Sequence, residues 1–148
     1  MATTRNFKAK KIIRTAGLMT GTSMDGLDIT IADIGLNNNI ADFNMIGTTS
    51  IPYPSDLQSQ IRQAVYGTKK YSSALDRDLG IWYAEKLFEY LRSESIDNIE
   101  LIGSHGQTIH HISGQSTLQI GDPSFLAEKF NIPVISDFRT ADIYAGGT

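Results

Sequence analysis

Residues 20–26 combine glycines and hydroxyl side chains in a way that could hold a phosphate group. Gly21 and Gly26 let backbone N–H groups approach an anion closely, and the hydroxyls of Thr20, Thr22 and Ser23 can donate hydrogen bonds to phosphate oxygens. The stretch differs from the P-loop pattern, because no lysine follows the second glycine. The same residue types also favour a plain hairpin turn, so composition leaves a phosphate-binding loop and a simple turn both open.

Asp25 lies inside this stretch and carries a carboxylate, which repels phosphate but attracts cations. Phosphoryl transfer requires the charge on the β and γ phosphates to be neutralised, and Mg²⁺ commonly does this. Because Mg²⁺ keeps several of its waters, a carboxylate can hold the ion through a water molecule. We therefore expect Asp25 to be a metal-site residue that organises Mg²⁺ through water.

A second polar segment, residues 103–108, directly follows an apolar stretch, a place where proteins built on sheets often present functional loops. His105, Gln107 and Thr108 offer several hydrogen bonds to a ligand rich in hydroxyl groups. Ser104 directly precedes His105, and adjacency in sequence does not make a nucleophile and its base. The segment therefore predicts ligand binding rather than covalent catalysis.

Two further histidines, His110 and His111, follow closely and suggest a transition-metal site, since imidazole is a common metal ligand. Neighbouring residues of an extended segment point to opposite sides, and no acidic residue or cysteine stands beside them to complete a ligand set. The pattern does not favour a metal site here.

A third candidate segment, residues 136–142, follows the last apolar stretch of the chain. Arg139 could clamp a carboxylate or hydroxyl group, and Asp137 or Asp142 could orient or deprotonate a sugar oxygen. A local ion pair between an aspartate and Arg139 that merely holds a loop explains the same residues equally well.

The overall composition excludes several classes of function. A formal net charge of -3 and a pI near 5.5 do not provide the basic surface that nucleic acid requires, and the absence of cysteine excludes thiol chemistry and disulfides. The basic start, residues 1–14, is followed by no apolar run of a signal peptide, and no stretch is apolar enough to span a bilayer. We expect residues 1–14 to be a flexible tail on a cytoplasmic protein that binds neither membrane nor nucleic acid.

The pattern of apolar residues predicts one α/β domain. Three strands form an antiparallel meander with turns at residues 20–26 and 35–39, and helices then alternate with strands around a polar loop that contains all three histidines. This order resembles a ribonuclease-H-like mixed sheet, with later strands parallel to the first and helices on both faces. The expected strands are residues 12–19, 27–34, 40–51, 99–103, 117–120 and 132–136, and the expected helices are one that starts with an N-cap at Ser55, residues 73–93 and residues 123–130.

Three patterns, in this order along the chain, resemble the anhydro-N-acetylmuramic acid kinase family: GLMTGTSMDGLD at residues 17–28, IGSHGQT at residues 102–108, and LQIGDPSFLAE through DFRTADIYAGG. The resemblance covers nearly the whole chain from Thr15. It implies membership in the sugar kinase, Hsp70 and actin superfamily, whose members bind ATP and sugar between two ribonuclease-H-like lobes. Residues 15–148 then form the amino-terminal lobe.

The resemblance also implies an activity and a set of site residues. The activity is ATP-dependent opening of 1,6-anhydro-N-acetylmuramic acid coupled to phosphorylation of its 6-oxygen, in cell-wall recycling, with ATP and Mg²⁺ as cofactors. The implied sugar-binding residues are His105, Thr108, Arg139 and Asp142. The implied ATP phosphate-binding residues are Thr20, Gly21, Thr22, Ser23, Met24, Asp25, Gly26 and Leu27.

The chain departs from the family pattern in two ways. Family members continue from the GG turn into a GAPLVP-like segment and a second lobe with the catalytic aspartate and the adenosine pocket, and Thr140 and Ala141 stand where many members have basic residues. We therefore expect a lobe that is inactive alone and needs a second lobe or a second chain, with an exposed apolar face that favours self-association. The alternative is a non-catalytic module that binds nucleotide or sugar, or that assembles with another chain.

Overall fold

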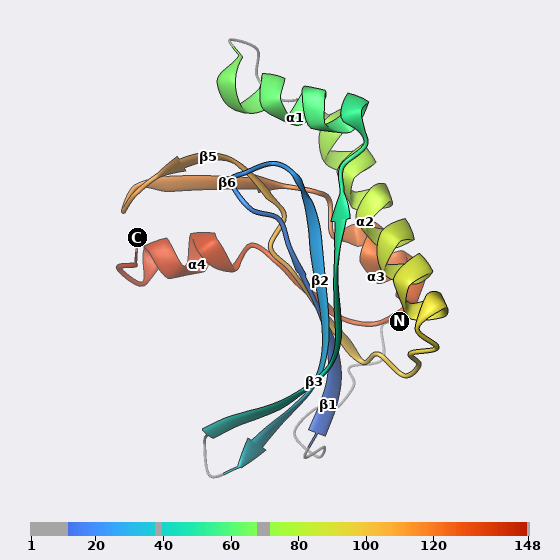
Figure 1. The fold of residues 1–148 in the computed structure, drawn as a ribbon. Helices are drawn as coiled ribbons and strands as arrows, with labels where there is room; N and C mark the ends of the chain where they lie inside the picture. Colours follow the sequence, from blue (N-terminus) through green and yellow to red (C-terminus); the bar gives the residue numbers. More distant parts are fainter. Residues whose placement is uncertain (1–11, 38–39, 68–71, 148) are drawn as a thin grey trace.

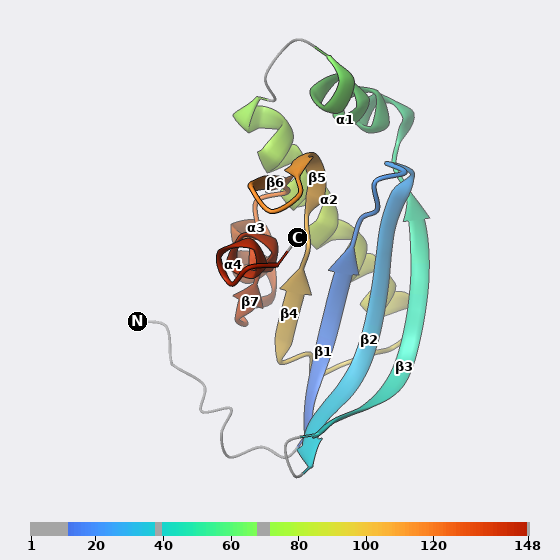
Figure 2. The same ribbon diagram turned by 90° about the vertical axis from the view of Figure 1, so that its left-hand side faces the viewer.

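The structure is a computed structural model that describes residues 12–37, 40–67 and 72–147. Its main element is a five-stranded mixed sheet with the strand order β3-β2-β1-β4-β7, accompanied by a separate two-stranded sheet, β5-β6 (Figures 1 and 2). The strands are β1 (Ile12–Met19), β2 (Gly26–Asn37), β3 (Ile40–Pro52), β4 (Leu101–Ser104), β5 (Gln107–Ile112), β6 (Ser116–Ile120) and β7 (Val134–Ile135). The helices are α1 (Ser55–Tyr66), α2 (Ser73–Ser93), α3 (Ser124–Phe130) and α4 (Phe138–Tyr144).

The pairing of the strands confirms the predicted topology. β1 pairs antiparallel with β2, and β2 with β3, while β4 runs parallel to β1 and β7 runs parallel to β4. Figure 1 shows α2 and α3 on one side of the sheet and α4 on the other. The expected mixed sheet with flanking helices is therefore confirmed. The parallel strands bring the ends of β1 and β4 to the same edge of the sheet, which is where the candidate loops lie.

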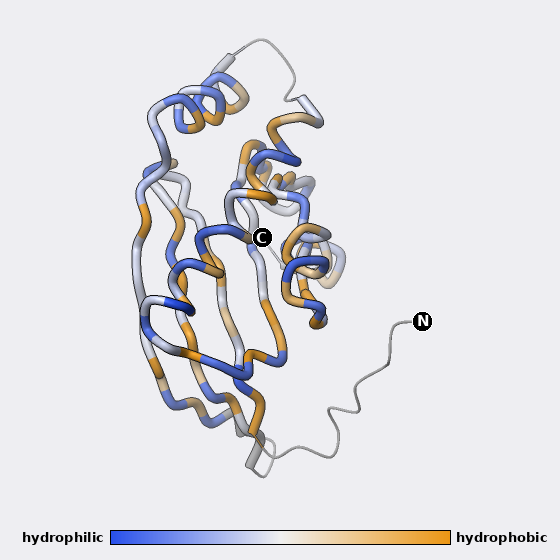
Figure 3. The backbone as a smooth tube through the Cα atoms, turned by 90° about the vertical axis from the view of Figure 1, so that its right-hand side faces the viewer, coloured by the Kyte–Doolittle hydropathy of each residue, from blue (hydrophilic) through white to orange (hydrophobic). Residues whose placement is uncertain are grey.

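The core lies between the sheet and α2. Polar and apolar residues alternate along the strands (Figure 3), so Leu27, Ile29 and Ile31 of β2 are buried while Asp28 is exposed. Ser72 caps the start of α2, because its side chain accepts a hydrogen bond from the backbone N–H of Leu75 at 3.2 Å. The buried face of α2 consists of Leu75, Leu79, Gly80, Trp82, Tyr83, Ala84, Leu87 and Leu91. Of the aromatic residues of α2, Trp82 and Tyr83 belong to the core, whereas Phe88 is exposed.

Several boundaries differ from the prediction for identifiable reasons. The loop expected to hold all three histidines is partly a strand: His110 and His111 lie in β5, because this segment forms a hairpin with β6 whose ladder satisfies its backbone groups, while His105 precedes the strand. That hairpin is a sheet of its own, so residues 117–120 do not join the main sheet. β2 continues through Gly35, which pairs with Asp42, so Gly35 lies in a strand and not in the expected turn. The strand expected over 132–136 is paired only at Val134–Ile135.

The segment 136–142, expected to be a loop, is mostly helix α4. Asp137 adopts a left-handed backbone conformation (φ 56°), which turns the chain out of β7 and into α4.

Of the expected tail, residues 12–14 lie in β1 and residues 1–11 lie outside the described part of the chain. Arg14 of β1 donates to both carboxylate oxygens of Asp33 at 2.8 and 3.1 Å. This hydrogen-bonded pair lowers the pKa of Asp33.

Candidate functional site

The loop between β1 and β2 is held in shape by its backbone. The N–H of Met24 donates to the carbonyl oxygen of Gly21 at 3.2 Å, and Met24 takes a left-handed conformation (φ 55°) that buries its side chain in the core. From outside the loop, the N–H of Tyr53 donates to the carbonyl of Asp25 at 3.0 Å, and the amide of Gln58 donates to that of Met24 at 2.8 Å. Several carbonyls of the loop are thus turned toward the protein, an arrangement that suits a loop whose N–H groups receive an anion.

The hydroxyl side chains of this loop have different surroundings. Thr20 is buried, and its hydroxyl donates to the carbonyl of Gly106 at 2.7 Å, so the side chain is used within the fold. Thr22 and Ser23 are exposed. The Ser23 hydroxyl donates to the carboxylate of Asp25 at 2.7 Å. The hydroxyls available to a ligand are therefore those of Thr22 and Ser23, and any contribution of Met24 to anion binding comes from its backbone.

A hollow of about 320 Å³ opens beside this loop. It contains two carboxylates, Asp25 and Asp28, and the hydroxyl of Ser50 donates a short hydrogen bond to Asp28. The wall at Gly26 is closely packed against β3. A Cβ atom at this position would collide with the carbonyl oxygen of Ile51. The residues that line the hollow are Gly21, Ser23, Asp25, Gly26, Asp28, Ser50, Ile51 and Pro52.

A buried hydrogen-bond network lies directly under the loop. Gln107 is fully buried, and its amide nitrogen donates to the carbonyl of Gly21 at 3.1 Å while its oxygen accepts from the Tyr53 hydroxyl at 3.2 Å. The Tyr53 and Tyr83 hydroxyl oxygens are 3.0 Å apart. Since Tyr53 donates to Gln107, Tyr83 donates to Tyr53. Burial raises the pKa of Tyr53 to about 12 and that of Tyr83 well above its ordinary value, so both remain neutral at physiological pH.

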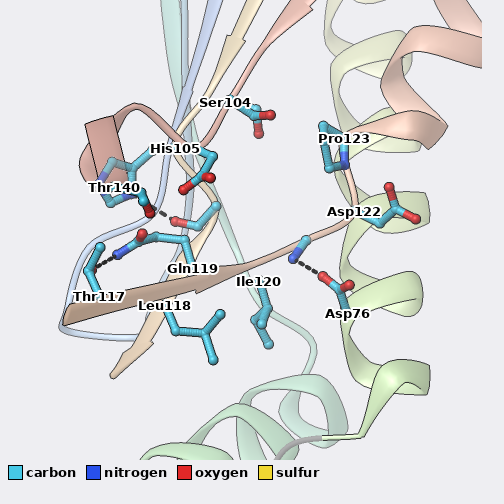
Figure 4. A pocket seen from close by; sticks show the side chains of 14 residues that line it. Asp76, Ser104, His105, Thr117, Leu118, Gln119, Ile120, Asp122, Pro123 and Thr140 are labelled. Carbon is cyan, nitrogen blue, oxygen red and sulfur yellow. Dashed lines mark hydrogen bonds between the residues drawn. The ribbon is translucent and has the colours of Figure 1, made fainter. Parts of the chain in front are cut away.

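A second cavity, of about 300 Å³, lies at the end of β4 between the β5–β6 hairpin, α4 and the turn that leads into α3 (Figure 4). Asp76 of α2 fixes that turn, because its carboxylate accepts a hydrogen bond from the N–H of Gly121 at 2.7 Å. The residues that line this second cavity are Asp76, Ser104, His105, Gly106, Thr117, Leu118, Gln119, Ile120, Gly121, Asp122, Pro123, Ser136, Asp137 and Thr140. We call it the β4-end pocket.

The turn of residues 105–107 connects the β4-end pocket to the β1–β2 loop. Gly106 lines the β4-end pocket and accepts the hydroxyl of Thr20 from the β1–β2 loop. Gln107, the next residue, reaches the same loop through Gly21. Gly106 has a positive φ of 74°, and a Cβ there would press on the carbonyl of Ile120, so this close approach requires glycine.

The predicted sugar-binding residues are distributed unevenly around the β4-end pocket. His105 lines it, and its Nδ1 donates to the carbonyl of Gly106 at 2.8 Å. Thr108 is not among the lining residues, and its hydroxyl accepts a hydrogen bond from the lining residue Gln119 at 3.1 Å. Arg139 and Asp142 are not part of the lining; they lie one turn apart on α4 with their charged atoms 3.8 Å apart. The local ion pair considered from the sequence is thus present.

Several pocket residues were not singled out from the sequence as site residues. Asp76 lies on α2, where its position in a helix gave no signal, whereas Gln119 and Asp122 lie inside the LQIGDP motif, which did signal them. Thr140, one of the two positions that depart from the family pattern, also lines the pocket. His110 lies on the exposed part of β5 with its Nε2 3.1 Å from the hydroxyl of Ser116. Within the described residues no group of three His, Cys, Asp or Glu side chains could hold a metal ion.

None of the helices in the described part of the chain is long and apolar enough to cross a membrane.

Comparisons with known proteins identify the family to which the chain belongs. Anhydro-N-acetylmuramic acid kinases of Bacillus cereus (strain AH820), Bacillus anthracis and Bacillus thuringiensis (strain Al Hakam) are each 38% identical to this chain over 143 residues. The matches cover 89% of this chain but 37% of each relative's length. The family model for anhydro-N-acetylmuramic acid kinase matches residues 13–148, and the chain therefore belongs to this family of sugar kinases.

Proposed function

We propose that this chain is the amino-terminal part of an ATP-dependent kinase that converts 1,6-anhydro-N-acetylmuramic acid to N-acetylmuramic acid 6-phosphate in the cytoplasm. The relatives bear the name of that kinase. Because the chain spans 37% of their length, further groups that such a reaction needs, including an adenosine pocket and a base that activates water, are proposed to come from residues outside the matched part.

The observation that carries this proposal is the hydrogen-bonded contact between the β1–β2 loop and the turn that borders the β4-end pocket. A kinase must hold the phosphate donor next to the acceptor, and it works chiefly by positioning and by electrostatic stabilisation. Here Gly106 and Gln107 belong to one short turn that borders the β4-end pocket and hydrogen-bonds to the β1–β2 loop. A phosphate held by the loop would thus lie beside a ligand in the pocket.

The β1–β2 loop suits the phosphate groups of ATP. Its exposed hydroxyls and its glycine backbone can donate hydrogen bonds, and Asp25 and Asp28 face one hollow. Two carboxylates suit Mg²⁺, which binds one or two protein carboxylates together with waters and phosphate oxygens. We propose that Asp25 holds the ion through water. When bound, Mg²⁺ would supply the positive charge that offsets the charge of the transferring phosphoryl group.

The β4-end pocket suits a sugar. Its volume of about 300 Å³ is at the lower end of the usual range for small-molecule sites, and its lining is rich in polar side chains. His105, Gln119 and Thr140 contribute nitrogen and oxygen atoms, and Asp76, Asp122 and Asp137 contribute carboxylates. We propose that Thr108 acts by orienting Gln119, and that the Arg139–Asp142 pair acts by orienting α4.

The sheet face away from α2 supports the expected self-association. Ile34 and Phe43 are paired across β2 and β3, and both side chains are exposed, by 39% and 67%. Met45 is exposed by 56% on the same strand as Phe43. Large apolar side chains gathered on one surface favour contact with another protein surface. We propose that, in the isolated chain, this surface associates with a second copy.

An assay of ADP release tests the proposed function. ATP, Mg²⁺ and 1,6-anhydro-N-acetylmuramic acid are supplied to this chain alone and to a fusion of this chain with the remaining part of the Bacillus cereus relative. We expect sugar-dependent ADP release only from the fusion, because half of a cleft leaves the phosphates facing water. An inactive fusion that still binds the sugar or ATP would instead favour the non-catalytic binding module.

A further inference from the structure

The hydroxyl group of Ser104 is buried without a partner. Ser104 is the last residue of β4, is 2% exposed and lines the β4-end pocket. Its Oγ is the one buried side-chain nitrogen or oxygen without a hydrogen bond in the described part of the chain. Leaving a buried hydroxyl unpaired costs free energy, so a native position that tolerates it requires an explanation.

The neighbouring buried polar groups are all satisfied. The Thr20 hydroxyl donates to Gly106, and Gln107 bonds both to Gly21 and to Tyr53. The other buried polar side chains near Ser104 therefore all have hydrogen-bond partners. The exception lies in the wall of a cavity, where a bound molecule could supply the missing partner.

The other polar groups of the pocket indicate what kind of molecule that is. Asp76, Asp122 and Asp137 carry carboxylates, and no lysine or arginine is among the residues that line the cavity. His105 already donates its Nδ1 proton to the carbonyl of Gly106. Gln119 already uses its amide nitrogen on the hydroxyls of Thr108 and Thr117. The pocket thus offers mainly acceptors, which favour a neutral group that donates hydrogen bonds and disfavour an anion.

We infer that Ser104 is a ligand-contacting residue whose hydroxyl forms a hydrogen bond with a hydroxyl group on the sugar ring bound in the β4-end pocket. The inference rests on the proposed function, because it takes the sugar as the occupant of this pocket. It also orients the sugar: uncharged hydroxyls face Ser104 and the surrounding carboxylates, and a negatively charged substituent points away from them.

Calorimetric titration of 1,6-anhydro-N-acetylmuramic acid into the full chain tests this contact, together with thermal unfolding of the unliganded variants. Ser104→Ala is expected to weaken binding roughly three- to tenfold, the loss of one neutral hydrogen bond. Its unliganded midpoint of unfolding should stay equal to or exceed that of the wild type, because the substitution removes an unpaired buried hydroxyl. Ser104→Cys, which keeps a side chain of similar shape but bonds weakly, should also lose affinity.

Ser113, exposed in the β5–β6 turn, provides the matched control, and Ser113→Ala should bind like the wild type. Wild-type affinity in Ser104→Ala would overturn the contact and leave the proposed function intact. Restored affinity in Ser104→Cys would show packing instead of hydrogen bonding, and a lowered unliganded midpoint in Ser104→Ala would show an internal partner. Competition by inorganic phosphate would show that the pocket takes an anion. A wild type that does not bind the sugar would overturn the sugar site and this contact together.

Discussion

The side-chain amide of Gln107 donates a hydrogen bond to the backbone carbonyl of Gly21 at 3.1 Å, although the two residues are 86 positions apart. This bond ties the first loop of the chain to the turn after β4. Gln107 also accepts from Tyr53, so one buried side chain of the second motif connects the candidate phosphate loop with the hydroxyl pair of Tyr53 and Tyr83.

Replacing Gln107 should therefore destabilise the protein as well as its site. Gln107→Leu has a similar volume but removes the acceptor of the Tyr53 hydroxyl proton and one of the two donors to the Gly21 carbonyl, and we expect a loss of about 1–3 kcal/mol in the free energy of unfolding. Urea unfolding followed by circular dichroism measures this loss. Gln115→Leu, at an exposed turn position, is the control and should change stability by less than about 0.5 kcal/mol. Equal stability of the two variants would remove the structural role of Gln107.

The wall formed by Gly26 should not accept a side chain. A Cβ at Gly26 would collide with the backbone carbonyl of Ile51, and backbone yields less readily than a flexible side chain. Gly26→Ala is expected to cost about 1–3 kcal/mol, in the range of other overpacked sites. Gly103→Ala is the matched control, because an added Cβ there meets no atom within 4 Å. Thermal unfolding of both variants tests the contrast, and equal midpoints would contradict it.

Alkaline pH should destabilise the fold through the buried tyrosines. Burial raises the pKa of Tyr53 from its ordinary value of 10.0 to about 12, so the unfolded chain releases this proton at a lower pH than the folded one. The stabilisation is therefore fully present below pH 10 and is lost as pH rises toward 12, by on the order of 2 kcal/mol.

Unfolding by urea between pH 8 and pH 12 measures this dependence. Tyr53→Phe should show a smaller fall than the wild type over the same range, because the variant lacks the ionising group. Tyr66→Phe, an exposed tyrosine, should follow the wild-type curve. A Tyr53→Phe curve parallel to the wild type would show that other groups cause the alkaline loss.

The role assigned to Asp25 predicts an effect on Mg²⁺ that is separate from folding. Asp25 is exposed, and its carboxylate accepts a hydrogen bond from Ser23, so Asp25→Asn should leave the unfolding midpoint nearly unchanged. In the active fusion we expect Asp25→Asn to raise the Mg²⁺ concentration for half-maximal ADP release roughly 10- to 100-fold, as for other residues that hold a metal indirectly. Asp42→Asn, exposed on β3, is the control, and equal Mg²⁺ dependence in both variants would remove the assigned role.

Self-association should depend on the exposed apolar surface of the sheet. We expect sedimentation velocity of the isolated chain to show dimers whose population rises with concentration. Phe43→Ser should shift the population toward monomer, since it removes the most exposed of the paired apolar side chains on β2 and β3. Tyr66→Ser, at an exposed aromatic residue of α1, should leave the distribution unchanged. A wild-type chain that stays monomeric at high concentration would contradict the proposal.

The elements with strong local patterns could be predicted from the sequence. The helical apolar spacing of α2 and the alternation along β2 specify a period and a face that no distant contact needs to supply. The N-cap expected at Ser55 was wrong, because Pro54 is the N-cap of α1 and no side chain caps that helix. Strand β5 and helix α4 could not be predicted in the same way. Their residues are polar and irregular, and β5 is a strand only because β6 satisfies its backbone.

The candidate site, too, could be predicted from the sequence only in part. The sequence by itself determined the family, the mixed sheet and the loop of residues 20–26, because these depend on local residue types in a fixed order. Only the tertiary structure decided which polar side chains share a cavity: it brought Asp76 and Gln119 beside Ser104 and His105, and it left Arg139 and Asp142 outside the lining. The reason is physical. A pocket is formed by segments that meet when β4 pairs parallel to β1 and α2 packs beneath them, and hydrogen bonds across 86 residues leave no periodic trace in the chain.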